Sequence, residues 1–384
     1  MKKKPIKSII ITVGNDLLDN IFIRRNTMRV FNFAAGPSTL PLPVLEEAKK
    51  DLTDYLGTGM SIMEMSHRGK TFMEVNAEAN ALLRELMGIP EDYAVLFVQG
   101  GATQQFAAVP FNLAVNKKAD YIVTGNFAKK AYEEGLKYGD MAVAASSEDK
   151  NFTYIPDMKN VKFRDGIDYV HFTHNNTIFG SRFTELPNTT ATLVSDMSSS
   201  ILSEVVDVKK FGLIYAGAQK NIAPAGVTIV IVKKELLGKH RADCPTMLRY
   251  DLQDKNDSLY NTPPCWPIYI AMLVFRHLKA LGGVPAMQKI NEEKAKLLYD
   301  FIDNSSFYTN SVNKKDRSMM NVPFVSPNPD LDAKFVKEAA AEGLVSLKGH
   351  RLVGGMRASI YNAMPVEGVK KLIEFMKKFE MENK

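Results

Sequence analysis

Apolar and polar positions follow two different periods along this chain. Between Leu42 and about Gly283, amphipathic stretches with helical spacing are separated by short, almost wholly apolar runs. This combination is typical of the crossover helices and buried strands of a mainly parallel sheet. The pattern therefore predicts an α/β fold for this part of the chain.

The apolar runs locate the strands of the predicted sheet. We expect buried strands at 94–98, 121–124, 168–172, 192–194, 213–216 and 227–232. A helix is predicted before them, because a set of apolar residues shares one helical face. These residues are Val44, Leu45, Ala48, Leu52, Tyr55 and Leu56.

The pattern changes after Gly283. A helical period over about 284–302 is followed by short apolar runs near 321–325 and by a C-terminal amphipathic helix. The apolar face of that last helix carries Val366, Val369, Leu372, Ile373, Met376 and Phe379. We therefore expect a flexible N-terminal extension (1–27), a large α/β domain (42–283) and a smaller α+β domain made of 28–41 and 284–384.

Charge is concentrated at the N-terminus. The chain has 384 residues, of which 45% are hydrophobic and 24% charged, as in ordinary globular proteins. Its net charge is +6, and residues 1–27 carry six basic and two acidic side chains, which leaves +2 for the remainder. Binding to nucleic acid or to an anionic membrane through this basic segment is an alternative function, although no nucleic-acid-binding motif accompanies it. We expect no nucleic-acid or membrane partner.

Cysteine content and the length of apolar runs bear on the cellular compartment. The only cysteines are Cys244 and Cys265, which is too few for a disulfide framework and gives no zinc-type spacing. No run reaches the ~20 apolar residues of a membrane helix, and the apolar run at 9–13 is short for a signal peptide. We predict a cytoplasmic protein without a metal site.

Lys220 is the most informative residue of the sequence. It lies in a loop of small residues between two very apolar strands, within the segment 213–226. A loop lysine is often simply solvated. A partly desolvated lysine can instead form a Schiff base that anchors a pyridoxal cofactor.

Two other features match what such a cofactor needs. Asp196 follows the strand at 192–194, where open α/β sheets bind ligands, and its carboxylate can keep a pyridine nitrogen protonated. Gly100 and Gly101 lie between a strand and a predicted helix, whose free N–H groups favour a phosphate. Alone, the aspartate also fits a helix cap and the glycines a tight turn.

Several longer motifs resemble those of the phosphoserine aminotransferases. They occur in order from about Met28 onward, and the sequence leaves open whether Met28 is the true start. The motifs are Phe31-Asn-Phe-Ala-Ala-Gly-Pro37, Glu64-Met-Ser-His-Arg-Gly69, Gly217-Ala-Gln-Lys-Asn221, Asn261-Thr-Pro-Pro264, Lys348-Gly-His-Arg351 and Gly354-Gly-Met-Arg-Ala-Ser-Ile-Tyr-Asn-Ala363.

The resemblance implies an aspartate-aminotransferase-like (fold type I) enzyme with a seven-stranded-type, mainly parallel sheet in its large domain. It implies one pyridoxal 5'-phosphate (PLP) per subunit, and a homodimer with active sites at the subunit interface. The implied reaction transfers the amino group of L-glutamate to 3-phosphohydroxypyruvate, giving O-phospho-L-serine and 2-oxoglutarate in serine biosynthesis. A related phosphorylated substrate of pyridoxine biosynthesis, at the 4-phosphohydroxythreonine step, is left open.

The resemblance also implies residue roles. Lys220 resembles the Schiff-base lysine, Asp196 the partner of the ring nitrogen and Phe127 the residue stacked on the ring. The other cofactor contacts implied are Ala102, Thr103, Thr177 and Gln219, with Asn261 and Thr262 reaching the phosphate from the partner subunit. The substrate-binding residues implied are His67, Arg68, His350, Arg351 and Arg357.

A substrate with a carboxylate and a phosphate needs two cationic clamps, and arginine binds either anion through two N–H groups. We assign Arg357 to the carboxylate, and the two His-Arg pairs to the phosphate. Some family members have an arginine where this chain has Thr103, a tryptophan at Phe127, or a serine at Ala35. Phosphate recognition therefore depends more heavily on Arg68 and on the C-terminal His-Arg pair.

Two other pyridoxal enzymes are the nearest alternatives. A cysteine desulfurase needs a reactive cysteine on a mobile loop, whereas Cys265 lies in the stiff sequence Thr-Pro-Pro-Cys-Trp-Pro. An alanine–glyoxylate aminotransferase has no need for so many anion-binding residues. Both alternatives fit less well than a phosphoserine aminotransferase.

Overall fold

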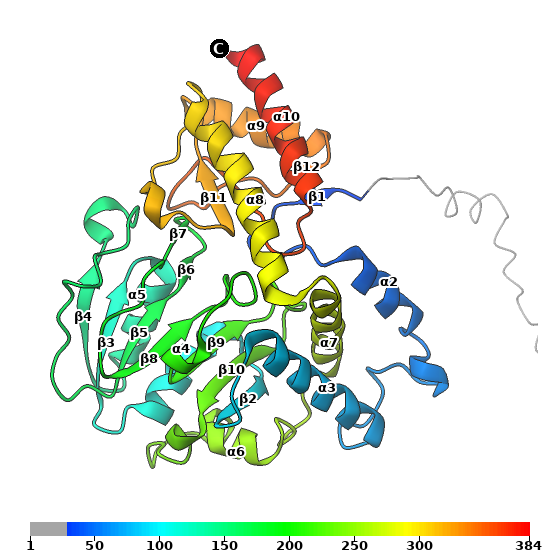
Figure 1. Ribbon diagram of the computed structural model, residues 1–384, viewed down its shortest axis with the longest axis vertical. Coiled ribbons are helices and arrows are strands. Elements are labelled where there is room, and N and C mark those ends of the chain that lie inside the picture. Colours follow the sequence, from blue (N-terminus) through cyan, green and yellow to red (C-terminus); the bar gives the residue numbers. More distant parts are fainter. Residues whose placement is uncertain (1–28) are drawn as a thin grey trace, which may run out of the picture. The chain divides into compact units, whose positions relative to one another are not determined.

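A seven-stranded sheet forms the centre of the computed structural model, which describes residues 29–384 (Figure 1). The predicted extension at 1–27 lies outside the described residues. The strands in spatial order are β2 (Tyr93–Val98), β10 (Thr228–Lys233), β9 (Leu213–Gly217), β8 (Thr192–Asp196), β5 (Tyr169–Thr173), β3 (Lys118–Val123) and β4 (Asp140–Ser146). All neighbours from β9 to β4 are parallel, while β10 is antiparallel to β9 and β2. The predicted α/β class and mainly parallel sheet are confirmed.

Both faces of this sheet are buried, which explains the continuous apolar runs. In β10, Ile229 and Ile231 point into one apolar core, and Val230 and Val232 into the other. This is the period of two that a strand imposes. The first core includes residues of α3 (Lys70–Met87) and α7 (Cys265–Ala280), and the second includes residues of α4 (Gly101–Leu113) and α5 (Asn126–Gly135).

Two sequence predictions about local structure need correction. The helix expected to bury Leu52 and Leu56 is α2 (Leu42–Lys50), which ends before both; they are 41% and 76% exposed, and Leu56 has a φ of 52°. Strand β4 was not predicted, because it is an edge strand with only one fully buried residue, Met141. The other edge strand, β2, is buried along most of its length and carries the apolar run at 94–98, so the exposure of β4, rather than edge position alone, explains why its sequence lacks such a run.

A separate apolar core lies above the sheet in Figure 1 and contains Phe33 together with residues of the C-terminal part of the chain. It is built around α8 (Gly283–Asn304), α9 (Pro329–Ala341) and α10 (Val366–Asn383). Two short sheets complete it: β1 (Phe31–Asn32) pairs with β12 (Leu344–Val345), and β11 (Asn321–Phe324) with β13 (Met356–Ser359). The remaining elements are β6 (Asn175–Asn176), β7 (Ser181–Arg182) and α6 (Tyr250–Lys255).

Helix α8 belongs to both parts of the molecule. Val284 and Met287 near its start pack in the core of the large sheet, and Leu298 and Ile302 pack in the C-terminal core. Within residues 29–384 no single helix is long and apolar enough to cross a membrane; α7 and α8 meet that condition only as a pair, with a bend of 82° between them.

Candidate active site

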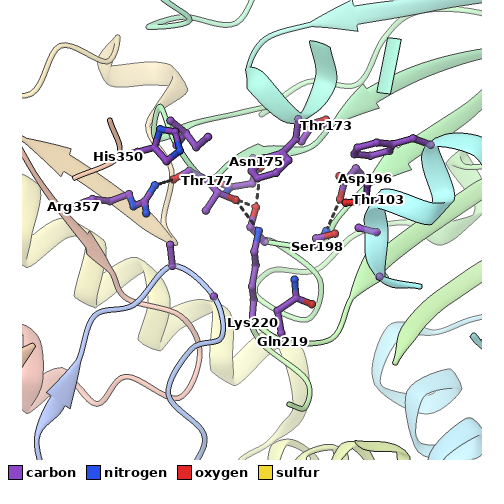
Figure 2. A pocket seen from close by; sticks show the side chains of 18 residues that line it. Thr103, Thr173, Asn175, Thr177, Asp196, Ser198, Gln219, Lys220, His350 and Arg357 are labelled. Atoms are coloured by element: carbon purple, nitrogen blue, oxygen red, sulfur yellow. Dashed lines mark hydrogen bonds between the residues drawn. The ribbon is translucent and has the colours of Figure 1, made fainter. Parts of the chain in front are cut away.

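A cavity of about 270 Å³ opens where the carboxyl ends of the parallel strands meet the C-terminal part of the chain. It lies at the end of the sheet where open α/β folds bind ligands. The residues that line it are Ala35, Gly36, Gly101, Ala102, Thr103, Phe106, Phe127, Thr173, Asn175, Thr177, Ile178, Asp196, Ser198, Ser199, Gln219, Lys220, His350 and Arg357. Figure 2 shows Lys220 between Arg357 and His350 on one side and Asp196 and Thr103 on the other.

The Lys220 side chain extends into this cavity from the loop after β9. Its Nζ donates a hydrogen bond to Thr177 Oγ1 at 2.8 Å and lies 5.7 Å from the centre of the Phe127 ring. Burial lowers the pKa of the amine to about 8, assisted by the positive charge of Arg357 and opposed by the negative charge of Asp196. At pH 7 about a tenth of the amine is therefore unprotonated and able to act as a nucleophile.

Local packing fixes the loop that carries Lys220. The Ser38 hydroxyl donates to the Lys220 carbonyl, and the Ser38 N–H donates to the Gln219 carbonyl at 2.9 Å. Gly36 runs beside the lysine: a Cβ there would lie 3.5 Å from two of the lysine's side-chain carbons, and its φ of +145° suits only glycine. The Phe31–Pro37 motif therefore forms one wall of the lysine's channel.

Asp196 is the last residue of β8 and lies deep in the cavity. Its Oδ1 accepts the Ser198 N–H at 2.9 Å, and the Ser198 Oγ accepts the Gly217 N–H at 3.0 Å. Burial raises the pKa of the carboxyl, while the Ser198 hydrogen bonds and the charge of Lys220 lower it. A cationic group placed beside Asp196 would favour the carboxylate form.

A turn of two glycines begins the helix on the other side of the cavity. Gly100 and Gly101 have φ values of +90° and +68°, and no side chain from residues 29–384 caps the start of α4. The first-turn N–H groups at Ala102 and Thr103 therefore face the cavity without a capping partner, which makes an anion-binding position.

The opposite wall is cationic and comes from the C-terminal core. The Nη1 of Arg357, in β13, donates to the Thr177 carbonyl at 3.2 Å, and burial lowers the pKa of its guanidinium. Burial also lowers the pKa of His350, as do the charges of Arg357, Arg351 and Lys130. His350 is therefore mostly neutral at pH 7.

Similar proteins identify the family. A family description, "Aminotransferase class-V", matches residues 30–372. The chain belongs to the class-V aminotransferases. A "Phosphoserine aminotransferase" of Bacillus cereus is 54% identical to this chain over 358 residues, which cover 93% of this chain and 99% of that one. Another phosphoserine aminotransferase, from Listeria monocytogenes, is 54% identical over 353 residues, which cover 91% of this chain and 96% of that one.

Solved structures of class-V aminotransferases share this fold. A phosphoserine aminotransferase from Bacillus circulans subsp. alkalophilus matches with a TM-score of 0.91 and 47% identity, covering 93% of this chain and 99% of that one. A PLP-bound phosphoserine aminotransferase from Trichomonas vaginalis matches with a TM-score of 0.88 and 40% identity. The match covers 91% of this chain and 100% of that one.

In this class-V aminotransferase, several cavity residues were not anticipated from sequence. The Thr173 hydroxyl is buried without a partner among the described residues, in register with Asp196 on the neighbouring strand. Asn175 donates to Ser199 Oγ and to Asn321 Oδ1, both at 2.9 Å. Their common signal is a group of polar residues at or shortly after the end of an apolar strand, 173–177 from the last residue of β5 and 198–200 after β8.

Five predicted residues lie outside the cavity of this single chain. His67 is buried, and its Nε2 has no partner among residues 29–384, whereas Arg68 and Arg351 are exposed. Asn261 lines a separate small cavity beside Gln99, whose Nε2 donates to the Thr262 carbonyl at 2.8 Å.

Proposed function

We propose that this class-V aminotransferase uses PLP to transfer the amino group of L-glutamate to 3-phosphohydroxypyruvate, forming O-phospho-L-serine and 2-oxoglutarate. The observation that carries the proposal is one cavity in which a buried, partly unprotonated lysine lies near a buried aspartate, between an uncapped helix start and a cationic wall. The relatives named as phosphoserine aminotransferases support the choice of substrates.

The residues of the cavity fit PLP. The phosphate has the uncapped start of α4 at Ala102 and Thr103, and the ring has the Phe127 face. Asp196 offers a carboxylate to the ring nitrogen, and the unpartnered Thr173 hydroxyl lies on the adjacent strand. Thr177 and Gln219 flank Lys220. When bound, PLP supplies an electron sink for bond changes at the α-carbon of the amino acid.

Lys220 has two tasks in this proposal. Its unprotonated amine would hold the cofactor through the aldehyde carbon, and the same amine can hold and deliver the proton exchanged at the substrate α-carbon. A pKa near 8 serves both tasks, since the amine is a good base and is still protonated often enough to return the proton.

Asp196 and Arg357 hold the reactants in place. Asp196 would stabilise a proton on the ring nitrogen of a bound cofactor, and its burial would strengthen that interaction. Arg357 binds the α-carboxylate of either substrate through its fork of N–H groups. We assign the phosphate to His350 and Arg351, together with His67 and Arg68.

A homodimer accounts for the residues that this chain leaves away from its own cavity. We propose that Asn261 and Thr262 contact the cofactor phosphate of a second copy, and that His67 and Arg68 reach the substrate in the same way. The segment before His67 exposes a set of apolar side chains that a second copy would cover. They are Leu56 (76% exposed), Met60 (45%) and Met63 (53%).

The two-domain division proposed here follows the separate apolar cores, with α8 joining 42–283 to the domain formed by 28–41 and 284–384. A cytoplasmic location is consistent with both cysteines being free thiols.

Purified protein tests the function directly. We expect a visible absorption band from bound PLP and glutamate-dependent amination of 3-phosphohydroxypyruvate. We expect much slower amination of hydroxypyruvate and glyoxylate. Preference for glyoxylate would instead support an alanine–glyoxylate aminotransferase, and nucleic-acid retention that survives removal of 1–27 would support the binding function. Amination of 3-hydroxy-2-oxo-4-phosphooxybutanoate tests the pyridoxine step.

A further inference from the structure

Lys130 lies at the edge of the candidate active site and has no role in the description above. It follows Phe127 by three residues in α5, so the two side chains share one helical face. Its Nζ lies 5.9 Å from the centre of the Phe127 ring, the same ring that has Lys220 Nζ 5.7 Å away. Because Phe127 lines the cavity, the Lys130 ammonium is within reach of its mouth.

Three cations from three different segments act on His350 at this mouth. Arg357 comes from β13, Arg351 from the turn before it and Lys130 from α5, and each lowers the pKa of His350. His350, Arg357 and Phe127 all line the cavity, and Lys130 Nζ lies 5.9 Å from the Phe127 ring, so these cations lie within interaction range of the imidazole, which ends at about 10 Å in salt. The mouth is therefore a concentrated positive region made by both parts of the fold.

Lys130 is available to bind an anion. It makes no ion pair with any residue from Arg29 to Lys384, whereas the adjacent Lys129 pairs with Glu148 at 2.6 Å. Two acidic residues lie one turn further along α5: Glu134 is held by Lys137 and by the Tyr138 hydroxyl, both at 2.6 Å, and Glu133 makes no ion pair with Lys130. Lysines 129 and 130 thus differ in environment, although they are neighbours in sequence.

The charge of the proposed substrate calls for such a residue. Arg357 is assigned to the carboxylate, and burial together with the neighbouring cations lowers the pKa of His350, which opposes the protonation of its imidazole beside a phosphate. Of the arginines assigned to the phosphate, this chain supplies Arg351 and a second copy supplies Arg68, while the start of α4 is assigned to the cofactor phosphate. A further cation from this chain would strengthen the binding of a dianion.

We propose that Lys130 is a specificity-determining residue that binds the phosphate of the substrate. Its ammonium neutralises part of the phosphate charge and favours phosphorylated over unphosphorylated 2-oxo acids. This inference rests on the proposed function. It assigns Lys130 no part in the proton transfer, so its loss raises KM for the phosphorylated substrate and leaves kcat nearly unchanged.

The test compares Lys130→Gln with the matched control Lys129→Gln and with the charge-retaining Lys130→Arg, all as PLP-loaded enzyme. For Lys130→Gln we expect kcat/KM for 3-phosphohydroxypyruvate to fall about 5- to 50-fold, the effect of one charge-assisted hydrogen bond at a partly exposed site. The turnover of hydroxypyruvate and the rate of the half-reaction with glutamate should stay within about twofold of the wild-type values. This is expected if Lys130 contacts the phosphate equally in the ground state and in the transition state. Lys129→Gln behaves as wild type, and Lys130→Arg recovers most of the loss.

Binding of inorganic phosphate, measured by calorimetry, gives a readout that does not depend on turnover. We expect weaker phosphate binding for Lys130→Gln and unchanged binding for Lys129→Gln. An unchanged preference for the phosphorylated substrate in Lys130→Gln, or an equal loss in Lys129→Gln, would overturn the role of Lys130. A wild-type enzyme without glutamate-dependent turnover would instead contradict the proposed function, and phosphate binding would still test Lys130.

Discussion

At the scale of single residues, the Lys220 amine is buried between a carboxylate and a guanidinium (Figure 2). Burial and Arg357 favour the neutral amine, whereas Asp196 favours the charged one, and the balance leaves a pKa of about 8. An exposed lysine has a pKa of about 10.4 and is almost wholly protonated at neutral pH. The environment of Lys220 is thus what makes it reactive.

The pH dependence of cofactor binding checks this environment. Below its pKa the amine is protonated and cannot attack an aldehyde, so the rate at which the apoprotein binds PLP should rise about tenfold per pH unit and level off near pH 8. Because Arg357 lowers the pKa of Lys220, Arg357→Gln should move the plateau to higher pH. Stopped-flow absorbance measures both rates, and a rise that continues to pH 10 in the wild type would contradict the assignment.

Sequence alone could predict some of these residues and not others. Lys220 and Asp196 were predictable because each follows an apolar strand and belongs to a recognisable chemical pair. Thr173 and Ser198 also follow strands, but hydroxyl residues are common there, and only the register of β5 and β8 shows that Thr173 lies beside Asp196. Contacts across strands depend on register, which one sequence does not reveal.

At the scale of elements, the turn between β2 and α4 gives the cavity its anion-binding end. A Cβ on Gly100 would lie 2.7 Å from the Gln104 Cβ and closer still to its amide, and the φ of +90° is itself unfavourable for other residues. The glycine therefore allows the tight entry into the helix.

Gly100→Ala should distort this turn and weaken PLP affinity by at least about tenfold, with about 1–3 kcal/mol lost from the free energy of unfolding. Gly238→Ala is the matched control, since its φ is +76° and a Cβ there meets nothing within 4 Å. It should lower stability by about 1 kcal/mol and leave PLP affinity unchanged. Fluorescence titration with PLP compares them, and equal affinities in the two variants would argue against the role of the turn.

Helix α8 carries a buried lysine that holds the segment after β13. Lys294 Nζ donates to the carbonyls of Ile360, Tyr361 and Met364 at 2.8–3.0 Å. These carbonyls lie just after Arg357, and the Tyr361 hydroxyl in turn donates to the Ala35 carbonyl at 2.7 Å. Lys294 therefore positions a segment that reaches the wall of the cavity.

Lys294→Met should lower the free energy of unfolding by about 2–4 kcal/mol, because three buried carbonyls lose their donor. Lys296→Met, in the same helix, removes only a surface pair with Asp300 and should change stability by less than about 0.5 kcal/mol. Urea unfolding of PLP-loaded protein distinguishes them. Similar midpoints for both variants would mean that the buried ammonium contributes little.

Predictions of elements succeeded where burial is uniform. Strand β10 is buried on both faces and gave an unbroken apolar run, whereas β4 at the edge did not. The prediction that helix α2 extends to Leu56 was wrong. The apolar spacing continues past Lys50, but the α-helix ends there and the backbone forms a separate short turn at 55–57. Hydrophobic spacing does not report what an apolar side chain packs against.

At the scale of the whole molecule, several residues implied by the family resemblance lie away from this chain's cavity, and the proposed homodimer accounts for them. His67, Arg68, Asn261 and Thr262 do not line this chain's cavity, and apolar side chains are exposed on the segment that leads to His67. A single sequence could suggest these residues through their motifs. It could not show which copy of the chain they serve.

Met63→Glu should disrupt the proposed dimer and weaken PLP binding together, because a charge would be placed in an apolar contact and the partner's phosphate contacts would be lost. Met381→Glu is the control, because Met381 is 76% exposed near the end of α10. Sedimentation velocity gives the oligomeric state. A dimer that withstands Met63→Glu would place the interface elsewhere.

The central claim is that Lys220 holds the cofactor, and one measurement tests it most directly. The PLP-loaded protein is reduced with borohydride, digested and mapped by mass spectrometry, with Lys220→Ala treated in parallel. We predict that the pyridoxyl group is found on Lys220 in the wild type and on no residue of the variant. A pyridoxyl group on a different lysine, or an equally modified Lys220→Ala protein, would contradict this account of the site.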